Sequence, residues 1–176
     1  MPLLKQNAFV ADQWSHLADE DALPDSAAIT VSLARLQKEW DTLAKHPGQF
    51  GVRLPNTVRE AELAPFLPRL ALVIVTFPAF NDGRSYSIAR QLRLEGYQGE
   101  IRAAGNVLPD QLQFMRQVGI DSFDVSDRFP LDSWLKASRQ MSLAYQRGLY
   151  RPVGEREVWS ERHRGFDAWE EQPHAG

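Results

Sequence analysis

The sequence contains no cysteine among its 176 residues. Without a thiolate the chain cannot hold a cysteine-ligated iron–sulfur cluster, exchange disulfides or use a cysteine nucleophile. Its four histidines, His16, His46, His163 and His174, are widely spaced and form no close pair. Structural zinc sites need several such ligands close together, so we expect no bound metal.

Long apolar runs and a strong excess of one charge are also lacking. The formal net charge is −3 at pH 7, whereas a dedicated nucleic-acid-binding domain usually has a basic face. No apolar run approaches the roughly 20 residues that span a bilayer. Residues 1–7 lack the apolar stretch of a signal peptide. We therefore expect a cytoplasmic protein that binds neither nucleic acid nor a membrane.

The common cofactor and nucleophile fingerprints are absent. Gly96, Gly99 and Gly105 do not have the spacing of G-x-G-x-x-G, and no G-x-x-x-x-G-K-[ST] occurs. Ser85 and Ser87 lack both a nearby histidine and the G-x-S-x-G elbow of hydrolases. The sequence therefore predicts no nucleotide cofactor and no evident electron carrier.

What the chain does contain is a regular alternation of strand and helix patterns. Strands are predicted at residues 29–33, 50–54, 70–75, 100–104 and 120–125. Helices are predicted at 36–46, from 55–57 onward, at 84–95, 109–118 and 131–148. Short connections between such elements favour right-handed crossovers and a parallel sheet. We predict an α/β fold of about five mostly parallel strands in an open doubly wound sheet, with a half-barrel as the alternative.

The length favours a single domain. We place it at residues 1–150, with a peripheral N-terminal segment at 1–27. The charged stretch 151–176 shows no clear periodicity and is predicted to be an extended C-terminal arm. Trp159 and Trp169 lie in this arm and would be suited to contact a second subunit.

The stretch Phe77-Pro-Ala-Phe-Asn-Asp-Gly-Arg-Ser-Tyr-Ser87 joins the most apolar strand to the next helix. Ligands of open α/β sheets bind at such carboxyl ends of strands. Exposed backbone N–H groups, the helix dipole and Arg84 would favour phosphate, sulfate or sulfite here, with Gly83 allowing close approach. In the alternative, Asp82 caps the helix and pairs with Arg84 or Arg102. Phe77 and Phe80 are expected to be core residues or pocket walls.

Three further residues are candidates for the same rim. Arg102 stands inside a predicted interior strand, where a charge needs a partner. Gly105 follows that strand, and Asp110 lies in the first turn of the next helix. Asp110 is equally explained as an acid that favours the helix dipole.

The same residues carry a resemblance to a known family. FPAFNDGRSYSIARQLR from Phe77 and GEIRAAGNVLPDQ from Gly99 resemble the bacterial domain of unknown function 934 family, over roughly residues 7–150. Members are commonly labelled oxidoreductases of sulfite reduction because of neighbouring genes for assimilatory sulfite reductase. The resemblance implies a role in sulfur metabolism but assigns no catalytic residue. The candidate binding positions on its pattern are Phe80, Asp82, Gly83, Arg84, Tyr86, Arg102, Gly105 and Asp110.

Three functional hypotheses follow. The leading one is an accessory protein of assimilatory sulfate or sulfite reduction that acts through a protein partner, such as the sulfite reductase, or through a small anion. This hypothesis assigns the protein a non-catalytic role, because the chain has no evident electron carrier. The second is an enzyme that uses the Asp82, Arg84 and Arg102 rim on a small anionic substrate. The third is a self-associating scaffold that forms a homodimer through the C-terminal arm.

Overall fold

A computed structural model describes residues 2–139, 143–144 and 156–157 of the chain. Its main feature is one sheet of eight strands, in the order β2-β1-β8-β7-β6-β5-β4-β3. The strands are β1 (Leu3–Lys5), β2 (Ala8–Val10), β3 (Ser15–His16), β4 (Ile29–Ser32), β5 (Phe50–Leu54), β6 (Leu72–Phe77), β7 (Glu100–Gly105) and β8 (Ser122–Asp124). Strands β3 to β8 are parallel, while β1 runs antiparallel to both β8 and β2.

Helices follow most of the parallel strands. They are α1 (Leu33–Lys38), α2 (Trp40–Leu43), α3 (Arg84–Leu94), α4 (Leu112–Gln117) and α5 (Leu131–Arg139). Short 3-10 turns occur at η1 (Glu60–Glu62), η2 (Leu67–Arg69) and η3 (Pro109–Gln111), and β9 (Leu143–Ala144) pairs with β10 (Arg156–Glu157). None of the helices in these described parts is long and apolar enough to cross a membrane.

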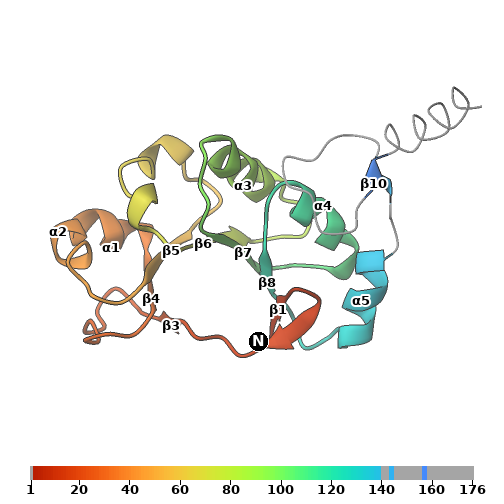
Figure 1. Cartoon of the computed structure of the whole chain (residues 1–176), viewed down its shortest axis with the longest axis horizontal. Helices are drawn as coiled ribbons and strands as arrows, with labels where there is room; N and C mark the ends of the chain where they lie inside the picture. Colours follow the sequence, from red (N-terminus) through yellow and green to blue (C-terminus); the bar gives the residue numbers. More distant parts are fainter. Residues whose placement is uncertain (1, 140–142, 145–155, 158–176) are drawn as a thin grey trace, which may run out of the picture.

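The connection between β2 and β3 requires the sheet to curl. These strands form its two opposite edges, yet only residues 11–14 join them. Eight flat strands would be about 34 Å wide at the usual spacing, whereas an extended link of this length reaches only about 17 Å. The two edges must therefore approach each other. Figure 1 shows this curled sheet, with residues 11–14 crossing its open side as a strap.

The strand order decides on which side the helices lie. From β3 to β8 each strand pairs with its neighbour in sequence, so successive right-handed crossovers place their helices on the same face. Figure 1 shows α1 to α4 on the outer side of the curve. The predicted α/β class is confirmed, but a doubly wound sheet is wrong because the strand order never reverses. The half-barrel alternative describes the fold.

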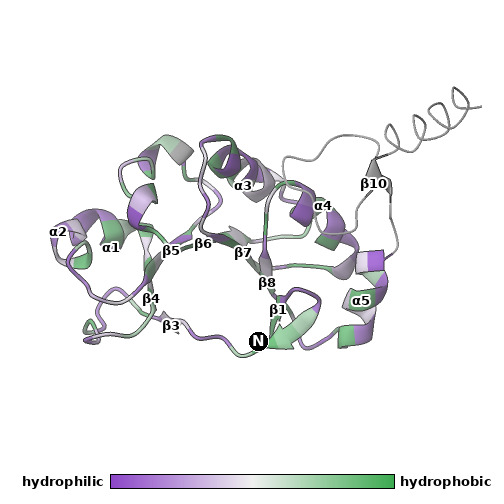
Figure 2. Ribbon diagram, viewed as in Figure 1, coloured by the Kyte–Doolittle hydropathy of each residue, from purple (hydrophilic) through white to green (hydrophobic). Residues whose placement is uncertain are grey.

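The outer face of the sheet holds the hydrophobic core. Side chains alternate between the two faces of a strand, and Val73, Val75 and Phe77 of β6 join Ile101 and Ala103 of β7 in one buried cluster. This cluster fills the space beneath the helices. Figure 2 shows hydrophilic residues along α3, consistent with a helix that covers the core and faces solvent. The intervening residues of each strand face the inside of the curve.

Several predicted boundaries agree closely, and three segments differ. The N-terminal segment predicted to be peripheral supplies β1, β2 and β3, with Leu4 in the core. The helix expected from residues 55–57 is replaced by η1 and η2, in a stretch where Pro65 and Pro68 remove backbone donors. The last predicted helix ends at Arg139, and β9 occupies 143–144. Apart from 156–157, the predicted arm lies outside the described residues.

Candidate functional site

A group of charged side chains lies on the inner face of the half-barrel. On β7, Glu100 and Arg102 point to the face opposite Ile101 and Ala103. Residue Arg102 pairs in register with Ser122 of β8, so Ser122 and Asp124 share this face. Side-chain contacts add residues from three further segments of the chain. We call the complete set the inner cluster: Lys5, Asp12, His16, Glu100, Arg102, Ser122 and Asp124.

Arg102 lies at the centre of the inner cluster and is only 1% exposed. Its Nη1 donates to Asp12 Oδ2 at 2.7 Å, and its Nη2 donates to Glu100 Oε1 at 3.3 Å. The same Nη1 is 3.8 Å from Asp124 Oδ1. Its Nε is buried and has no hydrogen-bond partner within the described residues. A buried guanidinium is stable only when carboxylates compensate its charge, and three do so here.

Asp12 comes from the strap and accepts three hydrogen bonds. Besides Arg102 Nη1, the donors are His16 Nε2 at 2.9 Å and the backbone N–H of Trp14 at 3.1 Å. Since a carboxylate can only accept, His16 must carry its proton on Nε2. Its Nδ1 is hydrogen-bonded to the Thr30 hydroxyl at 2.6 Å. One carboxylate therefore ties the strap to β3 and β7.

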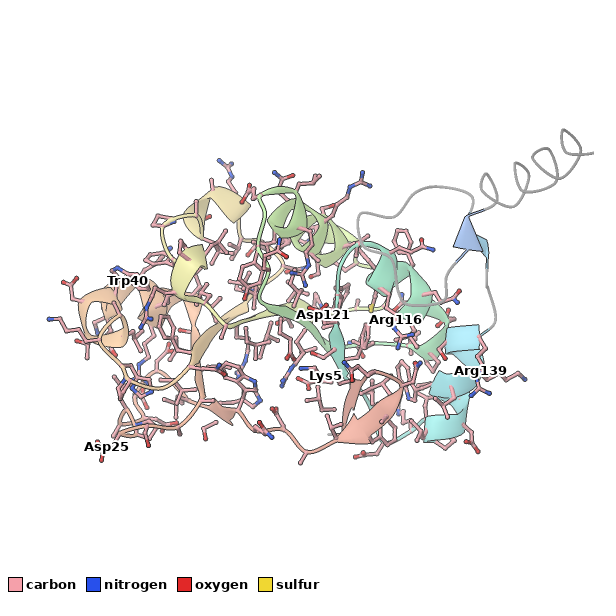
Figure 3. The ribbon with its side chains drawn as sticks, in the orientation of Figure 1. Lys5, Asp25, Trp40, Arg116, Asp121 and Arg139 are labelled. Atoms are coloured by element: carbon pink, nitrogen blue, oxygen red, sulfur yellow. The ribbon has the colours of Figure 1, made fainter. Side chains whose placement is uncertain are left out.

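The remaining acids have different partners. Glu100 accepts from Lys5 Nζ and from the Ser122 hydroxyl, and Figure 3 shows Lys5 inside the curve of the sheet. Burial opposes ionisation of both Glu100 and Asp12, but their hydrogen bonds outweigh it and lower both pKa values. Burial raises the pKa of Asp124, and the nearby charge of Asp12 adds to this rise. Asp124 is thus the acid of the cluster that takes up a proton most readily.

At the carboxyl end of β6, Asp82 is bound by its own neighbours. Its Oδ1 accepts from the backbone N–H and the Nε of Arg84, and its Oδ2 accepts from Arg84 Nη2 at 2.7 Å. The side-chain amide of Asn56 also donates to Oδ2. Hydrogen bonds from Arg84 lower the pKa of Asp82 to about 2. The Asp82 carboxylate therefore binds both the Arg84 side chain and the first backbone N–H of α3. This contact corresponds to the alternative in which Asp82 caps the helix and pairs with Arg84.

The two candidate glycines play different structural parts. Gly105 has a φ of +98°, and a Cβ there would overlap the carbonyl oxygen of Phe77. The close approach lets Asn106 N–H donate to that oxygen at 2.8 Å, which fixes the junction of β6 and β7. Gly83 has a φ of −81° and open space around its Cα. Backbone geometry therefore requires glycine at 105 but not at 83.

Aromatic side chains form an exposed surface beside this junction. Phe77 is buried in the core, whereas Phe80 is 60% exposed, so of the two expected settings, core or pocket wall, the core is wrong for Phe80. Tyr86 packs between Phe77 and Phe114, with ring centroids 5.0 and 4.9 Å apart. Burial raises the pKa of Tyr86 to about 12, and the charge of Asp110 adds to this. We call Phe80, Tyr86 and Phe114 the aromatic surface.

The structure thus divides the predicted residues between two places. Asp82, Gly83, Arg84, Phe80 and Tyr86 lie along one loop and helix start, and Tyr86 feels the charge of Asp110. Arg102 contacts none of them in the described residues; its partners are Asp12, Glu100 and Asp124. The candidate rim of Asp82, Arg84 and Arg102 is therefore not a single charged group.

Most of the inner cluster was not among the predicted site residues. One signal was available, because Glu100-Ile-Arg102-Ala and Ser122-Phe-Asp124 alternate polar and apolar residues. Such alternation indicates a sheet with one polar face. The part played by Asp12 had no comparable signal, since 90 residues separate it from Arg102.

We find no arrangement suited to a metal within residues 2–139 and the two short strands. No group of three or more His, Cys, Asp or Glu side chains in this part of the chain could hold an ion. In the inner cluster the cation that the acids surround is the guanidinium of Arg102.

Fold and site together define a half-barrel α/β protein with an ionic inner face and an aromatic surface at the carboxyl end of its strands. Residues 51–154 match the family model described as bacterial protein of unknown function, DUF934. The chain belongs to this family. No curated protein matches it.

Proposed function

We propose that this protein is a non-catalytic accessory factor of assimilatory sulfite reduction that acts by binding a protein partner through its aromatic surface. The link to sulfite reduction comes from the family resemblance. The choice of a protein partner over a small anion at the loop 77–87 comes from the pairing of its charges. Arg84 forms an ion pair with Asp82, so its charge is already balanced and does not favour binding of an anion.

The observation that carries the proposal is the exposure of Phe80 on a fixed backbone. The residue is 60% exposed, yet its carbonyl oxygen accepts from Gln111 Nε2 at 2.6 Å. Asn106 holds the carbonyl oxygen of Pro78 in the same way at 2.6 Å. Binding to a preorganised loop costs less conformational entropy than binding to a flexible one. Aromatic anchors of this kind contribute disproportionately to protein interfaces.

Phe114 extends the surface from α4. It is 56% exposed and contacts Tyr86 of α3. The loop carries Phe80 close to this pair along the chain, because its carbonyl oxygen is bound by Gln111, three residues before Phe114. The charge of Asp110 acts on Tyr86. An apolar centre with a polar surround is the usual composition of a protein interface.

A pull-down from sulfate-grown cells tests this proposal. Tagged wild-type protein should retain the assimilatory sulfite reductase, and a Phe80→Ser, Phe114→Ser variant should lose it. Leu94→Ser is the matched control, because Leu94 is equally exposed at 56% but lies at the far end of α3. Absence of the reductase from the wild-type eluate would contradict the proposal, as would normal growth on sulfate after deletion of the gene.

The scaffold hypothesis gives a different outcome in the same variants. If the protein forms a homodimer through its C-terminal arm, as that hypothesis states, both the wild-type protein and the double variant should be dimeric by light scattering. Retention of the reductase by a monomeric wild-type protein would instead favour the accessory role.

A further inference from the structure

The inner cluster contains an acceptor position that is filled by the protein's own strap. Arg102 Nη1–H and His16 Nε2–H come from β7 and β3, and both point at Asp12 Oδ2. Two donors from separate strands that meet at one oxygen form the geometry with which proteins bind oxyanions. The acceptor here belongs to residue 12, in a four-residue link that is exposed along most of its length.

We propose that Arg102 and His16 form a binding site for a small oxyanion on the inner face, and that Asp12 occupies this site as an internal carboxylate that the ligand displaces. The site lies apart from the aromatic surface and does not depend on the partner proposed above.

Charge balance permits the exchange. Asp124 and Glu100 remain beside Arg102, so the carboxylates of the intact cluster would repel an additional anion. Replacing the Asp12 carboxylate by another singly charged oxyanion, such as acetate, leaves the net charge of the cluster unchanged. Sulfate adds one further negative charge, which the exposed Arg53 on the same face would offset. Lys5 and Ser122 keep Glu100 paired throughout.

The strap is suited to release because few contacts hold it. Asp12 is its only residue with side-chain hydrogen bonds to the sheet in the described structure, and Ala11, Asp12 and Gln13 are exposed. The β3 strand beside it is only two residues long. The guanidinium would stay in place, since Glu100 holds its other nitrogen.

A further cation on the same face, Arg53, would attract the ligand. Arg53 of β5 and Arg102 of β7 flank Ile74 in register, so their Cα atoms are about 10 Å apart by the usual strand spacing. Arg53 is exposed and has no ion pair within the described residues. Its charge contributes to the field at the inner face, which favours the approach of anions.

The test removes the internal competitor and supplies a probe. We expect Asp12→Ala to bind sulfate at least about 10-fold more tightly than the wild type by calorimetry, because no tethered carboxylate competes for the donors. Sulfate should also raise the Tm of Asp12→Ala by about 2–5 °C relative to chloride at equal ionic strength. Acetate replaces sulfate in a parallel arm, and the more effective probe identifies the class of oxyanion.

Asp121→Ala is the matched control. Asp121 also pairs with a largely buried arginine, Arg93, and its side chain is 22% exposed against 25% for Asp12. Sulfate should stabilise Asp121→Ala no more than the wild type, because Arg93 also donates to three backbone carbonyl oxygens that share its charge. The proposal would be overturned if neither sulfate nor acetate had a larger effect on Asp12→Ala than on the wild type and Asp121→Ala. Binding to Asp12→Ala that survives a further His16→Ala change would also overturn it.

Discussion

Two arginine–aspartate pairs in this protein have similar geometry and opposite settings. Arg84 Nη2 is 2.7 Å from Asp82 and Arg102 Nη1 is 2.7 Å from Asp12. The Arg84 side chain is 60% exposed and its partner is two residues away, whereas Arg102 is 1% exposed and its partner is 90 residues away. The distance between two charges is therefore a poor guide to what a pair does. The contribution of each pair depends instead on how far its charges are removed from water and how far apart its residues are in the chain.

The exposed pair orders a local turn, while the buried pair holds the architecture. Asp82 is already close to Arg84 in the unfolded chain, so their contact adds little that folding must create. Asp12 and Arg102 meet only when the sheet curls and the strap crosses it. Four predictions follow in order of decreasing effect. Two of them test the contrast between the ion pairs, and two test a parallel contrast between Gly105 in the sheet and Gly83 in the exposed loop.

The largest effect is expected from Arg102→Met. This change leaves Asp12, Glu100 and Asp124 near one another without their shared cation, and breaking a buried ion pair typically costs about 3–5 kcal/mol. The free energy of unfolding should fall by that amount in urea at pH 7. The same change at Arg84 should have a far smaller effect. Similar losses for the two variants would refute the contrast.

Gly105→Ala should be the next most damaging change. A residue with a side chain resists a φ of +98°, at a cost of about 1–2 kcal/mol, and its Cβ would also overlap the carbonyl oxygen of Phe77. Urea denaturation at neutral pH measures this loss.

Gly83→Ala supplies the comparison for that glycine. Its backbone is compatible with alanine and nothing lies near the added methyl group. Alanine should therefore leave the free energy of unfolding unchanged or raise it by about 0.4–1 kcal/mol. A loss as large as that of Gly105→Ala would mean that the loop 77–87 is packed more tightly than its geometry indicates.

The smallest effect concerns the acid dependence of stability. The pKa of Asp82 is about 2 in the folded protein, below its ordinary value of 3.8. A lowered folded-state pKa contributes stability above the unfolded value, and this contribution disappears as the pH falls from about 4 to about 2. The urea midpoint of Asp82→Asn should therefore depend less on pH within this window than the midpoint of the wild type. An unchanged profile would show that the Asp82–Arg84 contact contributes nothing in solution.

Local elements were largely predictable because they depend on short stretches of chain. The strand at 50–54 is found at the expected residues, and α3 begins at Arg84 as predicted. Both follow from apolar patterning and a polar residue before the helix. The missing helix after Asn56 shows the limit of this approach. Prolines further along remove backbone donors from this stretch, and the Asn56 amide binds Asp82.

The residues of the candidate site likewise include contacts that the sequence could predict and contacts that it could not. The Asp82–Arg84 contact was foreseeable, since the two residues are neighbours in sequence and a helix start needs an acceptor. The exposure of Phe80 was not, because hydrophobicity alone does not say which side of a loop faces the core. Arg102 was correctly expected to need a partner, but its partners were beyond reach of local patterns.

The sequence by itself determined that this is an α/β protein without cysteine chemistry, and it marked the residues at which strands give way to helices. Only the tertiary structure decided the strand order, the curl of the sheet and the meeting of Asp12 with Arg102. The physical reason is that periodicity specifies which face of an element is apolar, whereas strand order depends on long-range pairing. A four-residue link between the two outer strands then closes the curve and carries Asp12 to the buried arginine.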